Sequence, residues 1–255
     1  MCIRDSMEMI KLEKVSFAFE NSTMETIDSI SFEADKGEYV SIVGPSGCGK
    51  STLLRIIAGL MHPTSGRVLF GEQEITEPNK KLSFVFQDFA LLPWLTNMEN
   101  VKIGLSRSDI SEEAKDKKAS ELLDRFGLSG FEQYYPNALS GGMKQRVGIA
   151  RSVASDPQVL LMDEPFSSLD ELTASSLRSD IVYMLENKNI SVNSVIMVTH
   201  NVEEAVELSD KIVVLSDKPT HVKQILKIHG GRPRDKRSKQ FAEYMDEIYS
   251  ILAKD

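Results

Sequence analysis

The stretch YVSIVGPSGCGKST, residues 39–52, joins an apolar run to a glycine-rich turn, then to a lysine and two hydroxyl residues. Residues 39–44 have the continuous apolar character of a buried strand, and KSTLLRIIAGL (50–60) predicts a helix that Gly59 can end. A strand, a glycine-rich turn and a helix in this order form a phosphate-binding loop, because backbone N–H groups and the helix N-terminus face the anion. The alternative is a chance match, which the flanking strand and helix disfavour.

Each residue type in this loop has a physical role. The Lys50 ammonium can reach the β- and γ-phosphates of a nucleotide, and the Ser51 hydroxyl can ligate Mg²⁺. Because thiolates are favoured at helix N-termini, we expect Cys48 to be a reactive thiol that Mg·ATP protects from alkylation. The residues expected to bind the nucleotide are Gly44, Pro45, Ser46, Gly47, Cys48, Gly49, Lys50, Ser51 and Thr52.

Two carboxylates end a second apolar strand, VLLMDEP at 159–165. Ligands of open α/β sheets bind at the carboxyl ends of the strands, so Asp163 is expected to join the Mg²⁺ shell. Glu164 is expected to polarise an attacking water. A helix-capping or solvated acidic pair is the alternative interpretation.

Polar side chains close two further strands. His200 follows SVIMVT (194–199), and we expect it to sense the γ-phosphate and to orient Glu164 and the water. Gln87 closes KLSFVFQ (81–87) and can offer its amide oxygen to Mg²⁺. Taken alone, each of these residues is equally compatible with a packed or surface position.

The composition of the 255 residues is that of a folded globular protein, with 41% hydrophobic and 27% charged residues. A net charge of −8 disfavours a large nucleic-acid surface, so we expect no nucleic-acid partner. No apolar run reaches the roughly 18 residues of a membrane span. The two cysteines, Cys2 and Cys48, make no disulfide framework, and we expect a cytosolic protein.

The order of the patterns predicts an α/β fold: a P-loop NTPase core with a mostly parallel sheet, an N-terminal antiparallel β subdomain and a helical subdomain. Strand patterns at 9–19 and 29–35 alternate, whereas those at 159–163, 194–199 and 211–216 are apolar throughout. Helices are expected over 111–127, with Ser111 as N-cap, and over 171–187 and 201–208.

We expect one domain over 9–229, with the helical subdomain inserted at about 88–157. Residues 230–255 are expected to form a linker and an amphipathic C-terminal helix with Phe241, Met245, Ile248 and Leu252 on one face. The opening residues 1–8 have no periodicity and are expected to be disordered or artefactual.

With LSGGMKQR at 139–146, these motifs resemble the ATP-binding subunit of ATP-binding cassette (ABC) transporters. LSGGMKQR is similar to the family's signature, SSLD at 167–170 to its D-loop, and Phe19 lies where the family has an aromatic that stacks on adenine. The resemblance implies ATP and Mg²⁺ as cofactors and ATP hydrolysis as the activity. The implied metal ligands are Ser51, Gln87 and Asp163; the implied catalytic residues are Lys50, Glu164 and His200.

The resemblance also implies partners. In this family two cassettes dimerise head to tail, so the signature residues would bind the ATP of the other subunit: Leu139, Ser140, Gly141, Gly142 and Met143. Ser167 and Asp170 would form the D-loop, and we expect the Lys144 and Arg146 side chains on a solvated helix face. A homodimer would stand at the cytoplasmic face of the membrane, with two permease subunits contacting Asp88–Glu99 and a solute-binding protein acting indirectly. A packed loop is the alternative for this segment, which carries Leu91, Leu92 and Trp94.

The segments GGRPRD (230–235), DFALLPWLT and FSSLDELT resemble the importer branch for nitrate, sulfonates, taurine and related solutes. A charged linker is the alternative for GGRPRD. Three rival functions stay open: the cassette of an exporter or lipoprotein-release system, a non-transport ABC ATPase, and a nucleotide-binding scaffold without catalysis. The residues Lys50, Asp163, Glu164 and His200 argue against the scaffold.

Overall fold

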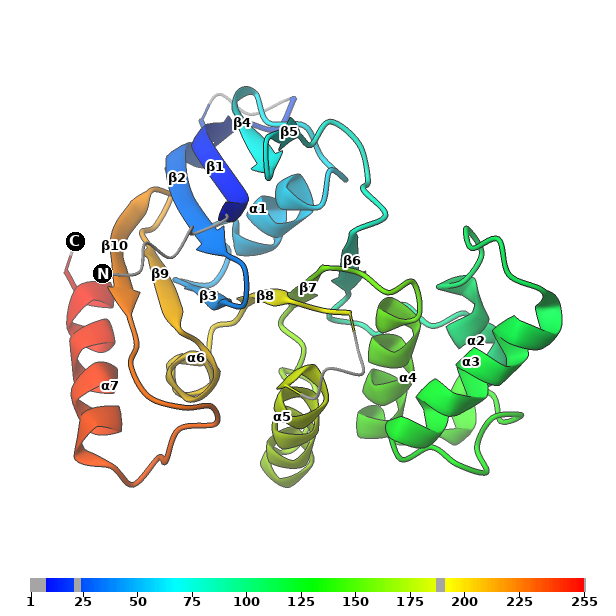
Figure 1. Ribbon diagram of the computed structural model, residues 1–255. Coiled ribbons are helices and arrows are strands. Elements are labelled where there is room, and N and C mark those ends of the chain that lie inside the picture. The colour runs from blue at the N-terminus through cyan, green and yellow to red at the C-terminus, as the bar shows by residue number, and fades with distance from the viewer. Residues whose placement is uncertain (1–7, 21–23, 187–190, 255) are drawn as a thin grey trace, which may run out of the picture. The chain divides into compact units, whose positions relative to one another are not determined.

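Residues 8–20, 24–186 and 191–254 are described by a computed structural model, in which the chain forms two units (Figure 1). The first unit takes residues 1–79 and 193–255, and the second takes residues 80–192. The expectation of disorder or artefact for residues 1–7 lies outside the described residues. Glu8, for which we expected the same, already belongs to the first strand.

The first unit begins with an antiparallel sheet of four strands in the order β2-β1-β4-β5. They span Glu8–Phe17 (β1), Ile27–Asp35 (β2), Ser65–Phe70 (β4) and Gln73–Glu74 (β5). Alternation along β1 places Ile10 and Leu12 in the core, while Lys11 and Glu13 stay partly exposed. The predicted N-terminal antiparallel subdomain is confirmed.

Three strands of the first unit, Tyr39–Val43 (β3), Ser194–Val198 (β8) and Lys211–Leu215 (β9), are buried at every position. β3 pairs in parallel with both β8 and β9, so the three carboxyl ends share one edge of the sheet. Val222–Lys227 (β10), which the sequence analysis did not anticipate, adds antiparallel to β9. The phosphate-binding loop, His200 and residues 216–221 all follow strands at this one edge.

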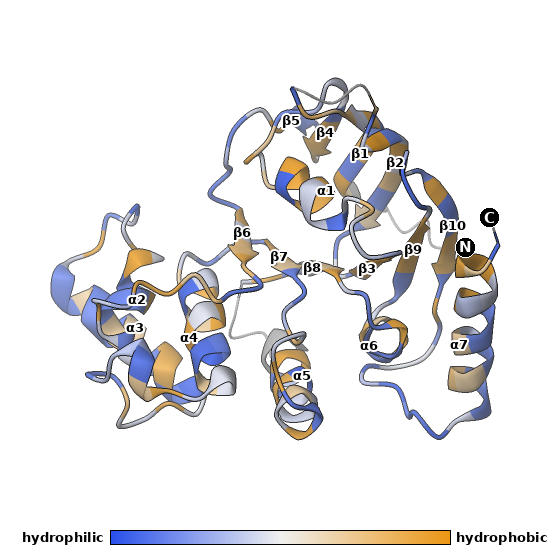
Figure 2. Ribbon diagram, turned by 180° about the vertical axis from the view of Figure 1, so that it is seen from behind, coloured by the Kyte–Doolittle hydropathy of each residue, from blue (hydrophilic) through white to orange (hydrophobic). Residues whose placement is uncertain are grey.

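Three helices complete the first unit: Lys50–Ile57 (α1), Val202–Leu208 (α6) and Lys239–Leu252 (α7). Both hydrophilic and hydrophobic segments run along α7 (Figure 2), and its apolar face, with Phe241, Ile248 and Ile251, packs with α6, β9 and β10. The expected helix face forms, with Ile251 buried and Leu252 only partly buried.

The segment GGRPRD is not simply a charged linker, because one of its two arginines is buried. The Arg234 side chain is only 7% exposed. Its guanidinium donates to the carbonyls of Val206, Ile228 and His229, each at 3.1 Å. Arg234 therefore closes the carboxyl end of α6 and the turn that leads to α7.

We predict that Arg234→Ala destabilises the fold by about 3 kcal/mol, because several buried carbonyls lose a charged donor at once. Arg237→Ala is the matched control, since Arg237 is exposed in the same segment. Urea unfolding followed by circular dichroism measures both. Equal midpoints for the two variants would contradict the role assigned to Arg234.

The second unit pairs two strands in parallel, Leu82–Val85 (β6) and Val159–Asp163 (β7). Its helices are Asn97–Ile103 (α2), Glu112–Arg125 (α3), Gly141–Val153 (α4) and Glu171–Glu186 (α5), with a 3₁₀ turn at Pro136–Ala138. The prediction of a helix over 111–127 is confirmed, and the Ser111 side chain caps it by accepting from the Ala114 N–H.

Helix α2 was not expected from the sequence, although its N-terminus carries a recognisable capping pattern. Thr96 and Glu99 form a capping box, in which each side chain accepts from the backbone N–H of the other residue. α2 is short, and its apolar residues are too few to set a helical period. The start of this short helix is therefore indicated by its capping residues and not by a helical period of apolar residues.

The predicted α/β class with a mostly parallel sheet, an antiparallel subdomain and a helical part is confirmed. The second unit contains β6, β7 and α5 as well as the helices expected for the inserted subdomain. Among the described residues, no helix combines the length and the apolarity that crossing a bilayer requires.

Candidate nucleotide site

The phosphate-binding loop of the first unit holds its lysine inward. The Lys50 ammonium donates to the carbonyls of Gly44 (2.9 Å) and Pro45 (2.8 Å), and the residue is 5% exposed. α1 begins at Lys50, so the N–H groups of its first turn lie beside the same ammonium. A positive charge and the N–H groups of a helix N-terminus therefore meet in one place, as a polyphosphate requires.

Gly49 gives the loop its turn. Its φ of +115° is a conformation that side chains rarely adopt, and a Cβ there would lie 3.0 Å from Cγ2 of Thr26. Only glycine satisfies both conditions at this N-cap. Thr26, at the entrance to β2, consequently forms the back wall of the loop.

Cys48 is not the reactive thiol that the sequence predicted. The residue is 2% exposed, and burial raises the pKa of its thiol, which the nearby Lys50 ammonium only partly offsets. The helix N-terminus argument is local, whereas desolvation comes from the surrounding fold and dominates here. The expectation of an accessible thiolate is wrong.

We predict instead that Cys48 is alkylated on the order of 100-fold more slowly in the native protein than in urea, because reaction must wait for local opening. A Cys2→Ser background leaves Cys48 as the one thiol of the chain. Mass spectrometry after timed iodoacetamide treatment gives both rates. Equal rates in buffer and in urea would show that the thiol is open in the native state.

Phe19 lies in the same unit as the phosphate-binding loop. The residue is 49% exposed, and its ring meets the Phe17 ring edge-on, with centroids 4.9 Å apart. One ring is therefore positioned by another while a large part of the Phe19 side chain stays open to a ligand.

His200 follows β8 and is exposed. Its neighbours are fixed: the Thr199 hydroxyl donates to Glu204 (2.7 Å) and accepts from the Asn201 N–H (3.0 Å). The Asn201 side chain in turn caps α6 by accepting from the N–H of Glu203 (2.9 Å). His200 is thus held between two anchored residues at the sheet edge that also carries the phosphate-binding loop.

In the second unit, the structure brings together Gln87, Glu164 and Ser167. Gln87 Nε2 lies 3.4 Å from both Glu164 Oε2 and Ser167 Oγ, and Ser167 Oγ donates to the Glu164 carbonyl at 3.0 Å. β7 ends at the buried Asp163, and Glu164 leaves the strand with a φ of +44°. Gln87 stands two residues beyond β6 rather than at its end.

The residues expected to hold Mg²⁺ suit that ion chemically. Ser51, Gln87 and Asp163 offer hydroxyl, amide and carboxylate oxygens, and Mg²⁺ prefers oxygen ligands. Because the Gln87 amide nitrogen faces Glu164 and Ser167, its oxygen is the atom left for a cation. Asp163 supplies a carboxylate that is only 2% exposed.

The signature segment, Leu139–Met143, opens α4 in the second unit. The exposed Ser140 is its N-cap and accepts from the Met143 N–H at 3.3 Å. Gly142 packs so tightly against α5 that a Cβ would lie 2.3 Å from Cγ2 of Thr173. Leu139 is buried beneath this turn, while Gly141 is exposed, so a helix N-terminus faces outward.

Asp170 caps the next helix rather than standing alone. Its carboxylate accepts from the Thr173 hydroxyl (2.7 Å) and the Thr173 N–H (3.0 Å), which lowers the pKa of Asp170. Thr173 also touches Gly142. The signature and D-loop segments are therefore packed as one piece within the second unit.

The expectation of a solvated Arg146 is wrong. Its guanidinium pairs with Asp180 at 2.6 Å and donates to the Phe126 carbonyl at 3.1 Å, which ties α4 to α5 and to the end of α3. Gln145, which the sequence analysis did not single out, is fully buried, and neither polar atom of its amide has a hydrogen-bond partner among the described residues.

Two residues that sequence reasoning missed shape the segment after Gln87. The Arg151 guanidinium donates to the carbonyls of Phe89 (2.8 Å) and Ala90 (2.6 Å), which have φ values of +63° and +45°. The fully buried Asn100 accepts from the Leu92 N–H (2.8 Å) and donates to several loop carbonyls. The hydrogen-bond partners of both residues are backbone atoms, so no residue pattern in the sequence could predict these contacts.

The same segment exposes its tryptophan. Trp94 is 68% exposed, whereas Leu91 and Leu92 are half-buried. The apolar cluster expected at the surface is therefore reduced to one large side chain, presented by a loop that Arg151 and Asn100 hold in shape.

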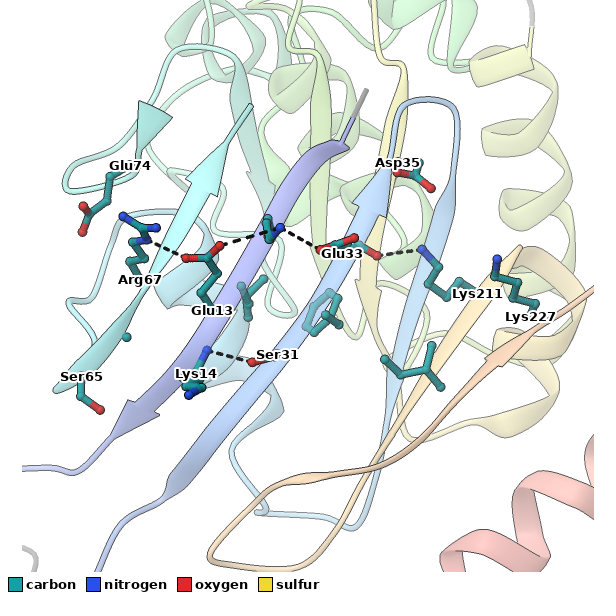
Figure 3. Close-up of a pocket in the computed structure, with 15 residues that line it drawn as sticks. Glu13, Lys14, Ser31, Glu33, Asp35, Ser65, Arg67, Glu74, Lys211 and Lys227 are labelled. Carbon is teal, nitrogen blue, oxygen red and sulfur yellow. Dashed lines mark hydrogen bonds and ion pairs between the residues drawn. The ribbon is translucent and has the colours of Figure 1, made fainter. Parts of the chain in front are cut away.

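A groove of about 1100 Å³ on the first unit is lined by none of the predicted nucleotide residues (Figure 3). A ladder of ion pairs crosses it, from Arg67 to Glu13 (2.7 Å), then through Lys11 to Glu33 (3.0 Å). The Arg67 hydrogen bond holds the pKa of Glu13 below its usual value. The Lys11 and Arg67 side chains of this groove are therefore already paired with carboxylates.

The predicted site residues therefore fall into two groups. Phe19, the residues of the phosphate-binding loop and His200 belong to the first unit. Gln87, Asp163, Glu164, the signature segment and the D-loop residues belong to the second.

The sequence is similar to a known protein family and to proteins of named function. A family model described as "ABC transporter" matches residues 27–167. An aliphatic sulfonates import ATP-binding protein of Bacillus thuringiensis subsp. konkukian is 40% identical over 241 residues, covering 94% of either chain. A nitrate import ATP-binding protein of Synechocystis sp. is 40% identical over 255 residues, covering 96% of this chain and 94% of the relative.

A solved structure is similar as well. It is a dimeric ATP-binding cassette in a post-hydrolysis state, bound to ADP and Pi, with a TM-score of 0.75 and 34% identity. The match covers 88% of this chain and 100% of that chain.

Proposed function

Since the chain belongs to the ABC transporter family as an ATP-binding and ATP-hydrolysing subunit, we propose that it powers the import of a small anion such as a sulfonate or nitrate. The observation that carries the nucleotide assignment is the loop in which Lys50 is held against the Gly44 and Pro45 carbonyls at the start of α1. The import assignment is supported by the names of the two relatives.

In this proposal the loop of residues 44–52 binds the phosphates and Phe19 stacks on the adenine, since the exposed part of its ring is open to a ligand. Mg²⁺ would neutralise phosphate charge while held by Ser51, Gln87 and Asp163. Glu164 polarises the attacking water, and its contact with Gln87 fixes the carboxylate. His200 orients Glu164 and the water.

The proposed working state is a homodimer in which each ATP lies between the phosphate-binding loop of one subunit and the signature segment of the other. The exposed N-terminus of α4 at Ser140 and Gly141 supports this role, because its backbone donors can face a γ-phosphate. The D-loop, with Ser167 and Asp170, would adjoin the same interface.

We further propose a peripheral position at the cytoplasmic face of the membrane, against two permease subunits. Residues 88–99 are the proposed contact, and the exposed Trp94 supports it. A solute-binding protein would act through the permease. The proposed domain organisation is one cassette over 9–229 followed by the segment 230–255.

The experiment is reconstitution of the chain into proteoliposomes with a candidate permease and solute-binding protein from the same genome. We expect ATP hydrolysis that rises with a sulfonate or nitrate on the binding-protein side and vanishes in Lys50→Ala. Movement of solute away from the side on which ATP is hydrolysed would indicate export instead of import. No hydrolysis by the wild-type complex would overturn the ATPase proposal.

A further inference from the structure

The segment between β9 and β10 contains a threonine that reaches the phosphate-binding loop. Thr220 is fully buried, and its hydroxyl donates to the Cys48 carbonyl. Its N–H donates to the Thr26 carbonyl (3.1 Å), and its carbonyl accepts from the Asp28 N–H (2.8 Å). All three polar groups of Thr220 are therefore engaged, and one of them holds the loop.

The contact fixes the direction of one peptide group. The peptide between Cys48 and Gly49 is planar and trans, so its C=O and its N–H point in opposite directions. With the Cys48 carbonyl held from behind by the Thr220 hydroxyl, the Gly49 N–H must point to the other side. That side is where a phosphate-binding loop presents its donors.

Thr26 extends the same scaffold. Its side chain abuts Gly49, its carbonyl binds the Thr220 N–H, and its own N–H donates to the Phe17 carbonyl at 2.8 Å. Phe17 in turn supports the Phe19 ring. A series of hydrogen bonds that ends in the contact between the Phe17 and Phe19 rings therefore links the phosphate-binding loop to the ring proposed to bind adenine.

We propose that Thr220 is a positioning residue for the nucleotide: its hydroxyl aims the Gly49 N–H at the phosphates. The inference rests on the proposed nucleotide site. The residue touches no nucleotide itself and acts through the Cys48–Gly49 peptide.

Thr220→Val removes the hydroxyl and keeps the shape, and Thr220→Ser keeps the hydroxyl. We expect Thr220→Val to weaken Mg·ATP binding about tenfold in titration calorimetry, equivalent to about 1.4 kcal/mol, and Thr220→Ser to stay near wild type. Ser209→Ala is the matched control, because Ser209 shares a buried hydroxyl pair with Ser41 (2.5 Å) in the same unit. It should lower the melting temperature and leave the affinity unchanged.

A second measurement needs no nucleotide. Amide hydrogen exchange of peptides covering 44–52 should accelerate in Thr220→Val and not in Ser209→Ala, at a temperature where both are folded. Unchanged Mg·ATP affinity in Thr220→Val would overturn the inference whatever the exchange rate, as would equal losses in Thr220→Val and Thr220→Ser. Lys50→Ala separates the two proposals: if it abolishes binding while Thr220→Val does not alter it, only the inference falls. A wild-type protein without Mg·ATP affinity overturns the proposed function.

Discussion

Glu164→Gln is expected to lower ATP turnover at least about 100-fold while leaving Mg·ATP affinity nearly unchanged, because positioned general bases contribute about 10²–10⁴ in rate. The amide has the shape of the carboxylate, and Gln87 can still bond to it through Nε2. Binding without turnover should accumulate the ATP-bound dimer, which gel filtration with Mg·ATP detects.

The matched control is Glu121→Gln, which removes one carboxylate charge from an exposed position on α3 of the same unit. It should hydrolyse ATP like the wild type and form no trapped dimer. A Glu164→Gln protein that turned over ATP at the wild-type rate would remove Glu164 from the mechanism and leave its contact with Gln87 as a purely structural one.

Local patterns predicted the features that local physics controls. The phosphate-binding loop could be predicted because glycines, a lysine and a helix start are contiguous in the chain. Buried strands could be predicted because β3, β8 and β9 are apolar at nearly every position, which a partly exposed strand would not tolerate. The Ser111 cap followed from the same local chemistry.

Burial of polar groups could not be predicted from those patterns. Arg146 and Arg234 are charged residues in polar surroundings; Arg146 was expected on a solvated helix face, and Arg234 was expected within a linker. In the fold their partners are mostly backbone carbonyls and an acidic side chain on other elements. Any residue can supply a carbonyl, so the sequence holds no sign of such a partner.

At Cys48, burial has a larger effect on the thiol pKa than the neighbouring helix N-terminus and Lys50 have. The place of Cys48 beside a helix N-terminus and Lys50 favours the thiolate, yet the residue is only 2% exposed and its Sγ packs beside Gly44. Tertiary desolvation therefore reverses the direction of the pKa shift.

Ser140→Asp is expected to abolish hydrolysis of the ATP bound to the other subunit, by at least about 100-fold, because it sets a carboxylate against the γ-phosphate and removes a hydroxyl donor. Asp is as good an N-cap as Ser, so α4 keeps its cap. Ser111→Asp makes the same change at the cap of α3 and should leave turnover unchanged.

Two mixed dimers, purified through different tags, decide whether the site is shared. If one subunit carries Lys50→Ala and its partner Ser140→Asp, a shared site leaves one complete pair: the intact lysine of the second meets the intact serine of the first. If one subunit is wild type and its partner carries both changes, no complete pair remains. We therefore expect one Mg·ATP to be trapped in the first dimer and none in the second when both also carry Glu164→Gln. The opposite pattern would mean that Ser140 serves the nucleotide of its own chain, and the outward-facing helix N-terminus would then need another ligand.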